Sequence, residues 1–373
     1  MIEPRKPGPE KRSRPQEPAV VRAITADRLE GVLLGTAVGD ALGLPAENLS
    51  PGRIRKFWPG EWEMRFLGSY GMVSDDTEHT LLVAQSLLAQ PSDPEAFQRS
   101  LAWKFRWWFA ALPAGTGMAT ARACLKLWLG FPLRMSAVRS AGSGPAMRCA
   151  ILGAYFAEDM ERRRNFVSVS SRLTHRSWQA EAAAHAVSEC VASAVRNQVQ
   201  PKVTEVLALL RPISAELEWE DLLSRIETGL SESLSVAEFA QRLGLAGGVT
   251  GYSLHLVPVS IYAWLRHPND FHGSLIAALD CGGDTDTVGA VVGALAGAVI
   301  GSRGIPAAWV DSIHEWPRSV GFMRILAKRL SDQYISAEPL GPVPYCWPGV
   351  LLRNLLFFAV VLGHGFRRLF PPY

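Results

Sequence analysis

The chain has too little surplus charge of either sign to indicate a charged partner. Its 373 residues include 38 Lys and Arg against 35 Asp and Glu, which leaves a formal charge of +3. Proteins that grip nucleic acid along its phosphates carry a strongly basic surface, so nucleic acid is not indicated as a partner. A hydrophobic share of 48% also excludes a disordered protein. The composition therefore predicts a globular protein with a substantial core.

Cysteine is scarce, and its spacing matches no metal or redox motif. The five cysteines are widely separated, and no two of them form a C-x-x-C pair. This spacing argues against zinc, iron–sulfur and thiol–disulfide chemistry, and an odd number does not suggest a disulfide framework. We expect reduced core thiols and a cytoplasmic protein.

Neither end of the chain has a long unbroken apolar run. Residues 1–23 are basic and proline-rich without an apolar stretch, which predicts a disordered tail and not a signal peptide. Near the other end, Val350 to Phe366 is apolar, but its longest unbroken run, 355–363, has nine residues. A bilayer span needs about 18 to 20. We expect 335–373 to be an extension whose helix docks on the core, with contact to a membrane surface as the alternative.

Helical periodicity is the main signal in the rest of the chain. Apolar residues recur at intervals of three and four, as in Leu81, Ala84 and Leu88. Alternating β-branched runs are few, the clearest being 166–170, and no series of strands has the spacing of βαβ units. We therefore predict an all-α fold with one compact domain over residues 24–334.

Two of the expected helices carry a glycine at every fourth position. The glycines are Gly31, Gly35, Gly39 and Gly43 in one helix, and Gly289, Gly293, Gly297 and Gly301 in the other. Each glycine inside a helix costs about 0.5 to 1 kcal/mol relative to alanine, so the repeats require compensation. We expect close backbone approach between helices. The second helix, 287–300, is almost wholly small and apolar, which predicts that it is buried on every side.

Two segments rich in carboxylates and hydroxyls stand at expected helix starts. One contains Ser74, Asp75, Asp76, Thr77 and Glu78, and the other contains Asp284, Thr285, Asp286 and Thr287 after a Gly-Gly pair. Helix capping explains either segment alone, but each offers more oxygens than one cap uses. Hard oxygen ligands without Cys or His favour Mg²⁺ or Mn²⁺, with Ca²⁺ as an alternative. If the two segments face each other, Asp286 can bridge two ions.

A third candidate lies at the end of the first glycine-rich helix. Pro45 is expected to end that helix and to place Glu47 just beyond it. Taken alone, Glu47 fits a surface loop residue, and Asp40 fits a buried carboxylate whose hydrogen bonds order the turn.

In their order along the chain these segments resemble the ADP-ribosylglycohydrolase family. The similar motifs are Gly31-x-x-x-Gly35-x-x-x-Gly39-Asp40-Ala41-x-Gly43-x-x-x-Glu47, then Ser74-Asp75-Asp76-Thr77, then Gly282-Gly283-Asp284-Thr285-Asp286-Thr287, and finally Ile305-Pro306-x-x-Trp309. The resemblance covers about residues 29 to 320. It implies a single compact orthogonal helical domain with central Gly/Ala-rich helices.

The resemblance also implies two Mg²⁺ or Mn²⁺ ions as cofactors. By position, the ligands would be Ser74, Asp75, Asp76, Asp284, Asp286 and Thr287, with Asp286 touching both ions. Glu47 matches a glutamate that acts as acid and base in some members. We expect Glu47 to be catalytic, assisted by Asp75 and Asp76.

Further segments resemble the substrate loops of the family. The loop 142–148 is similar to one whose backbone N–H groups cradle a diphosphate, although Ser143 replaces an Asn and Pro145 lacks an N–H. The expected substrate-binding residues are Gly115, Gly117, Ser143, Gly144, Ala146, Met147 and His175. Tyr252 is a candidate for stacking on adenine, with a core aromatic as the simpler interpretation.

The implied function is metal-dependent hydrolysis of the bond between ADP-ribose and a modified acceptor. The partner would be an ADP-ribosylated protein or small molecule, and ADP-ribose the product. One alternative is a non-catalytic ADP-ribose-binding or crystallin-like member of the same fold. The other is a phosphatase, because 284–288 also fits D-x-D-x-[TV]; that motif should end a strand of a parallel sheet, whereas a helical pattern precedes it here. The sequence does not indicate the acceptor.

Overall fold

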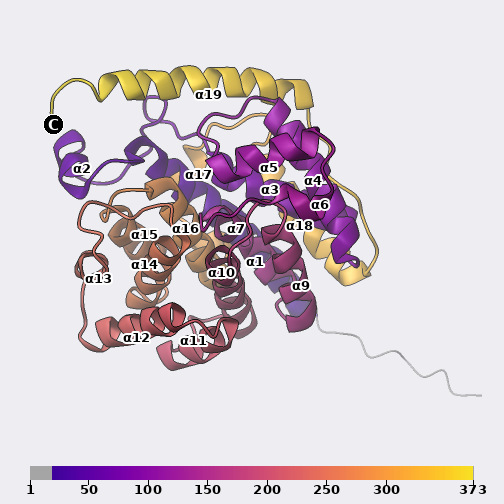
Figure 1. Ribbon diagram of the computed structural model, residues 1–373, viewed down its shortest axis with the longest axis horizontal. Coiled ribbons are helices and arrows are strands. Elements are labelled where there is room, and N and C mark those ends of the chain that lie inside the picture. The colour runs from indigo at the N-terminus through magenta and orange to yellow at the C-terminus, as the bar shows by residue number, and fades with distance from the viewer. Residues whose placement is uncertain (1–18, 373) are drawn as a thin grey trace, which may run out of the picture.

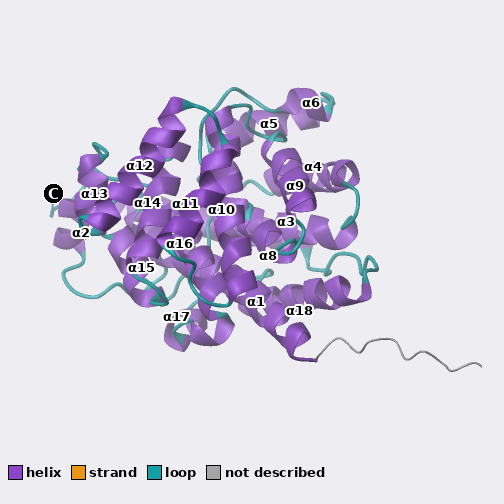
Figure 2. Cartoon of the chain, turned by 90° about the horizontal axis from the view of Figure 1, so that it is seen from below, coloured by secondary structure: helices purple, strands orange, loops and turns teal. Residues whose placement is uncertain are grey.

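A computed structural model describes residues 19–372, and in this range the chain forms helices and loops without strands (Figures 1 and 2). The all-α prediction is therefore confirmed. The helices are α1 (Ala19–Gly43), η1 (Leu44–Ala46), α2 (Pro51–Phe57), α3 (Asp75–Ala89), α4 (Pro94–Ala110), α5 (Met118–Trp128), α6 (Leu133–Ser136), α7 (Gly144–Arg148), α8 (Ala150–Tyr155), α9 (Met160–Ser171), α10 (Trp178–Asn197), α11 (Val203–Leu210), η2 (Arg211–Ile213), α12 (Leu217–Ser231), α13 (Val236–Arg242), α14 (Ser253–Arg266), α15 (Phe271–Leu279), α16 (Thr285–Ile300), η3 (Ser302–Gly304), α17 (Ala307–Asp311), α18 (Val320–Ser336) and α19 (Trp347–Arg367).

Several expected boundaries shift. Residues 19–23, assigned to a disordered tail, begin α1, while 1–18 lie outside the described residues. The alternating run 166–170 is part of helix α9, because tertiary packing overrides its weak strand preference. Of the five thiols, four are buried as expected, but Cys346 is exposed just before α19.

The two glycine-rich helices, α1 and α16, pack against each other along their glycines. A Cβ added to Gly35 or Gly39 would overlap the carbonyl oxygens of Gly293 and Gly289, and additions on the α16 side would overlap α1 in the same way. The expected close approach is therefore confirmed, and it explains why alanine cannot replace these glycines. The helices run antiparallel, so the C-terminus of α1 lies beside the N-terminus of α16.

The α1–α16 pair is the centre of the domain. Helices α10, α14 and α15 pack on α16, and α3 and α18 pack on α1. Every residue of α16 from Thr285 to Val299 is buried. Because the pair cannot shift without backbone overlap, the two loops at its end, after α1 and before α16, have fixed positions.

The last helix, α19, lies along the outside of the domain (Figure 1). It docks as expected, with Arg353, Asn354 and Phe357 buried. The expectation about its length needs correction, because α19 continues through Arg353 and His364 to 21 residues with a mean hydropathy of 1.6. Among the described residues it is one of two helices long and apolar enough to cross a membrane, the other being Ala26–Ala46.

Candidate active site

The Gly282–Gly283 turn joins three loops at the start of α16. The N–H of Gly283 donates to the Leu49 carbonyl at 2.8 Å, and its carbonyl accepts from the Asn48 N–H at 2.7 Å. Gly283 has a φ of +86°, and a Cβ there would overlap the backbone of Val249. Only glycine fits such a left-handed, crowded position. The turn therefore brings Glu47, which precedes Asn48, against the N-terminus of α16.

Asp40 of α1 orders the start of α3. Its buried carboxylate accepts hydrogen bonds from the N–H groups of Ser74 at 2.9 Å and Thr77 at 3.1 Å. Burial raises the pKa of Asp40 to about 6, although these hydrogen bonds act in the opposite direction. The interpretation of Asp40 as a carboxylate that orders a turn is confirmed.

The two acidic segments meet at Asp76. Its Oδ2 atom accepts from the Ser74 hydroxyl at 3.0 Å and from the Thr287 hydroxyl of α16 at 3.2 Å. Its Oδ1 atom is buried and has no hydrogen-bond partner. The expected convergence of the starts of α3 and α16 is therefore found, and it leaves a buried carboxylate oxygen without a partner.

The carboxylates of the site raise one another's pKa values. Burial, and then the neighbouring carboxylates, raise the pKa values of Asp75, Asp76 and Asp286 well above the ordinary range. Burial also raises those of Glu47 and Asp284. Buried anions at this density require protons or a cation. The oxygen-only donor set and the unpartnered oxygen of Asp76 suit a hard divalent cation.

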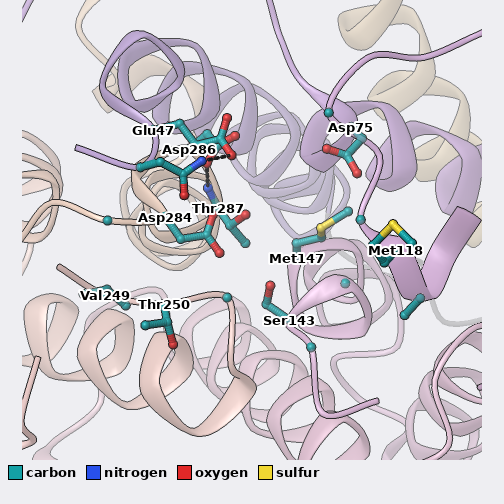
Figure 3. A pocket seen from close by; sticks show the side chains of 18 of the residues that line it. Glu47, Asp75, Met118, Ser143, Met147, Val249, Thr250, Asp284, Asp286 and Thr287 are labelled. Carbon is teal, nitrogen blue, oxygen red and sulfur yellow. Dashed lines mark hydrogen bonds between the residues drawn. The ribbon is translucent and has the colours of Figure 1, made fainter. Parts of the chain in front are cut away.

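The carboxylates nevertheless do not form a closed set of ligands. Over residues 19–372, no three His, Cys, Asp or Glu side chains are gathered tightly enough to enclose an ion. In Figure 3 Asp75 lies across the cavity from Glu47, Asp284 and Asp286. The structure therefore does not gather the expected ligands around one point, and the metal ligands stay a prediction.

These side chains border a cavity of about 580 Å³, within the usual range for small-molecule sites. The expected site residues that line it are Glu47, Asp75, Gly115, Gly117, Ser143, Gly144, Met147, His175, Asp284, Asp286 and Thr287. Ser74 and Asp76 are buried behind this lining. Ala146 is fully buried and does not line the cavity, so it is not available to a substrate there.

The N–H groups of the expected diphosphate loop are mostly used inside the protein. The Ser143 N–H donates to the Gly251 carbonyl at 2.9 Å, and those of Ala146 and Met147 donate to the Ser143 carbonyl at 2.8 and 3.2 Å. The cradle expected from this loop is therefore wrong for these three N–H groups. The side chains of Ser143 and Met147 do face the cavity (Figure 3).

Arg148 and His175 support the wall next to this loop. The buried Arg148 guanidinium donates to the carbonyl of Ser170 and the hydroxyl of Thr174, each at 2.8 Å, which makes it structural. His175 lines the cavity, and its Nδ1 lies 2.8 Å from the same hydroxyl. Burial and then the charge of Arg148 lower the pKa of His175 to about 3, so the ring is neutral at ordinary pH.

Sequence reasoning missed the loop 247–251, which forms another wall of the cavity. Its three glycines in five residues were a usable signal, because Gly248 has a φ of +128° and packs against Gly283. Asn48, Met118, Ala119, Thr120 and Ser140 also line the cavity without having been expected. Tyr252 does not line the cavity, and its hydroxyl donates to Glu218 at 3.0 Å, so the stacking role has no support.

The surroundings of Asp284 disagree with the phosphatase alternative. Helix α15 precedes the motif and α16 follows it, and no strand occurs among residues 19–372. A D-x-D nucleophile at the end of a parallel strand therefore has no counterpart in the part of the chain that the structure describes.

Comparisons with known proteins point in one direction. The profile of the ADP-ribosylglycohydrolase family matches residues 22–339. An uncharacterized protein of Archaeoglobus fulgidus is 30% identical over 317 residues, covering 83% of this chain and 97% of the relative. The ADP-ribosyl-[dinitrogen reductase] glycohydrolase of Rhodospirillum rubrum is 27% identical over 301 residues, 77% of this chain and 90% of that enzyme. A solved ADP-ribosylglycohydrolase-related protein complex superposes with a TM-score of 0.59 at 28% identity, over 84% of this chain and 99% of the other.

Proposed function

Because the chain belongs to the ADP-ribosylglycohydrolase family, we propose that it is a Mg²⁺- or Mn²⁺-dependent hydrolase of ADP-ribosylated proteins or small molecules. Family membership supports ADP-ribosyl hydrolysis in general, and the metal requirement is what we propose in addition. The observation that carries this step is Asp76, whose buried Oδ1 has no partner in a site crowded with carboxylates. The proposed bond to break joins the ribose anomeric carbon to the acceptor.

The metal ligands proposed are the six oxygen donors at the starts of α3 and α16. They are Ser74, Asp75, Asp76, Asp284, Asp286 and Thr287. Bound divalent ions would supply positive charge that polarises ribose hydroxyls and lowers the pKa of a bound water. The residues themselves hold the donors rigidly, since Asp40 fixes the turn at Ser74 and the glycine pair fixes α16.

Glu47 is the proposed proton carrier. It lines the cavity next to Asp284, and burial followed by the charge of Asp284 raises the pKa of its carboxyl. A raised pKa brings a carboxylic acid toward the range in which it both gives and takes protons at neutral pH. Glu47 would accept a proton from the attacking water, and a carboxyl of the site would return one to the departing acceptor.

The decisive experiment measures ADP-ribose released from arginine-linked, serine-linked, guanidine-linked and DNA-end-linked substrates with Mg²⁺, Mn²⁺ or chelator. We expect release from at least one substrate with metal and none with chelator. Asp286→Asn should lower the rate about 100-fold or more, because it removes a buried charge from the reacting centre. Asp311→Asn, which neutralises an exposed carboxylate on α17, is the matched control and should leave the rate unchanged.

Two outcomes would contradict the proposal in different ways. Equal release with chelator, or by the Asp286→Asn variant, would show hydrolysis that does not use this metal site. ADP-ribose binding without release from any substrate would instead favour the non-catalytic alternative.

A further inference from the structure

Helix α19 buries polar as well as apolar side chains against the domain and turns most of its large apolar side chains outward. Arg353 and Asn354 are buried against the domain. The outward side chains are Leu352, Leu355, Leu356, Phe358, Leu362 and Phe366, followed by Leu369 and Phe370 after the helix, and they are 49% to 66% exposed. A surface helix of a water-soluble domain normally turns polar and charged side chains outward. A contiguous apolar face of this kind usually contacts another surface.

The charge around this face suits an anionic partner. Residues 347–372 contain no Asp or Glu, and of their three arginines Arg367 is exposed, whereas Arg353 and Arg368 donate hydrogen bonds to the domain. At the C-terminal end, α2 adds Arg53, Arg55 and Lys56. The two segments are in contact there, because Arg53 donates to the Arg368 carbonyl at 3.2 Å and the Arg367 guanidinium lies 5.1 Å from the Phe57 ring centroid. The apolar face therefore ends in a basic cluster.

Tryptophans border the other end of the same face. The ring of Trp347, at the start of α19, packs on Trp107 of α4 with centroids 5.2 Å apart. Trp103, Trp107 and Trp128 are 38% to 57% exposed. Indole rings favour the boundary between lipid headgroups and acyl chains, because they are apolar with one polar N–H.

We propose that α19 lies flat on an anionic lipid bilayer and attaches the domain to that surface. The outward face enters the apolar boundary of the bilayer, and the basic cluster meets anionic headgroups. In this proposal the helix stays on the domain and does not span the bilayer. Leaving the domain would break the hydrogen bonds of 2.7 to 2.8 Å that Arg353 donates to Glu315 and Asn354 donates to the Ala111 carbonyl. The proposal is independent of the reaction.

Cosedimentation of the full chain with lipid vesicles tests this proposal. We expect binding to phosphatidylcholine vesicles that contain phosphatidylglycerol, weaker binding to phosphatidylcholine alone, and partial release by salt. Replacing Leu362 and Phe366 together by Glu should lower the bound fraction about tenfold or more, because two exposed apolar side chains that would enter the bilayer are lost. Leu217→Glu is the matched control, since Leu217 is 86% exposed on α12, at the opposite side of the domain (Figure 1).

The same double variant also tests whether a second copy of the chain, and not a bilayer, covers this face. Light scattering that shows a dimer, dissociated by the two Glu substitutions, would overturn the proposal in favour of a second copy of the chain. A monomer that sediments with neither kind of vesicle would overturn it as well. The melting temperature should be unchanged in all variants, because the replaced side chains are exposed.

The inward side of α19 carries a second, independent inference. The Arg368 guanidinium donates to the carbonyls of Pro45 and Glu47, each at 2.8 Å. Arg353 donates to the Val73 carbonyl, and its partner Glu315 accepts the Val73 N–H at 3.2 Å. The segment 347–368 lies beyond the family match at 22–339, yet it holds the backbone next to both acidic segments.

We infer that Arg368 is a positioning residue for Glu47, an inference that rests on the proposed function. Glu47 sits on a short loop between η1 and α2, and its backbone carbonyl is held by the guanidinium from outside the cavity. A planar guanidinium can donate to two carbonyls at once, whereas an ammonium group matches this geometry poorly. Loss of the contact would let the Glu47 loop move without removing any group from the cavity.

Comparison of Arg368→Ala with Arg367→Ala tests this role. We expect kcat of Arg368→Ala to fall about tenfold, because small misplacements of a reacting group are costly, while ADP-ribose affinity stays unchanged. Amide hydrogen exchange at Asn48 and Leu49 should become faster, and Arg368→Lys should restore part of the rate. Arg367 neighbours the same region but donates to the carbonyls of Phe370 and Pro371 instead, so its variant serves as the control.

The two readouts keep this inference separate from the proposed function. If the wild type releases no ADP-ribose, the proposed function fails, and exchange at Asn48 and Leu49 still reports whether Arg368 holds the loop. If the wild type is active and Arg368→Ala changes neither kcat nor exchange, the positioning role is wrong.

Discussion

The two longest apolar helical stretches among residues 19–372 differ in how far they are buried. In the stretch Ala26–Ala46, which includes most of α1, the most apolar window of 18 residues has a mean hydropathy of 1.2, and 94% of that window is buried. The corresponding window of α19 has the higher mean hydropathy, 1.6, and only 28% of it is buried. The more apolar helix is the more exposed one, so hydropathy does not decide which helix enters the core.

The difference lies in the size of the side chains and in which face they occupy. In α1 a stripe of glycines permits the backbone of α16 to approach, and this contact buries both helices. In α19 bulky Leu and Phe side chains point outward, and the face that contacts the domain is fixed by buried arginine and asparagine. Both helices nevertheless hold the backbone of the candidate active site. Asp40 of α1 accepts from the Ser74 N–H, Arg353 of α19 donates to the Val73 carbonyl, and Arg368, just after α19, donates to the Glu47 carbonyl.

Substitution of equivalent residues in the two helices should give the largest contrast. Gly39→Leu would overlap the Gly289 carbonyl, and overpacking between two backbones cannot be relieved by rotamer changes. We expect loss of the fold, seen as insoluble protein or as a lost cooperative thermal transition. Gly365→Leu on α19 should keep the melting temperature or raise it, because an added Cβ meets nothing there and leucine favours helix. A stable Gly39→Leu variant would contradict the close packing of α1 on α16.

The buried polar face of α19 should show the next largest effect. Arg353→Leu leaves Glu315 and Glu78 with less compensation in a buried cluster, which costs about 3 kcal/mol. Arg324→Leu breaks a partly exposed ion pair with Glu30 and should cost less than about 1 kcal/mol. Urea unfolding of both variants measures the difference. If both variants lose the same free energy of unfolding, the buried Arg353 does not hold α19 on the domain.

A substitution at the start of α3, where Asp76 accepts a hydrogen bond from Thr287 of α16, should raise the stability of the metal-free protein and abolish its response to metal. Asp76→Asn removes a buried charge, which should stabilise the metal-free protein by about 1 to 3 kcal/mol. Burial and neighbouring carboxylates raise the pKa of Asp76 in the folded protein well above its ordinary 3.8. The metal-free wild type should therefore lose stability as the pH rises from 3.8 toward that raised pKa. The dependence of stability on pH should be weaker in the Asp76→Asn variant.

Calorimetry of both proteins with and without Mg²⁺ provides the measurement. Mg²⁺ should raise the melting temperature of the wild type and leave that of Asp76→Asn unchanged. A variant that is less stable than the wild type without metal would show that Asp76 is a structural cap and not a strained ligand.

The smallest expected effect is on the outward face of α19. Leu355→Ser should change the free energy of unfolding by less than about 0.5 kcal/mol, because the side chain is half exposed in the folded domain. Phe357→Ser, two residues further on, removes a buried ring that packs on Phe66 and should cost about 3 kcal/mol or more. Thermal unfolding of the pair maps which side of α19 meets the domain. Similar losses would mean that the outward face is covered.

The sequence alone determined the features that depend on local spacing. Helical periodicity, glycines at every fourth residue and clustered oxygen donors at helix starts are set by residues a few positions apart, and they predicted the all-α fold and the carboxylates at the starts of α3 and α16. The expected substrate-loop residues, such as Ser143 and His175, came from the family resemblance. The family resemblance rested on the same local motifs. The loop 247–251 was not predicted as part of the site, although its glycines were a usable signal. The burial of Ala146 depends on how the short helix α7 packs in the folded domain, which its local sequence does not contain.

Tertiary structure alone decided which of these segments meet. Asp76 touches Thr287 across 211 positions of sequence, and Arg368 touches Glu47 across 321. The sequence also could not tell which face of α19 is turned toward the domain, because apolar attraction has no direction and depends on the surfaces available. The physical reason is that burial and hydrogen bonding are satisfied by the whole packed domain, and no short segment contains that information.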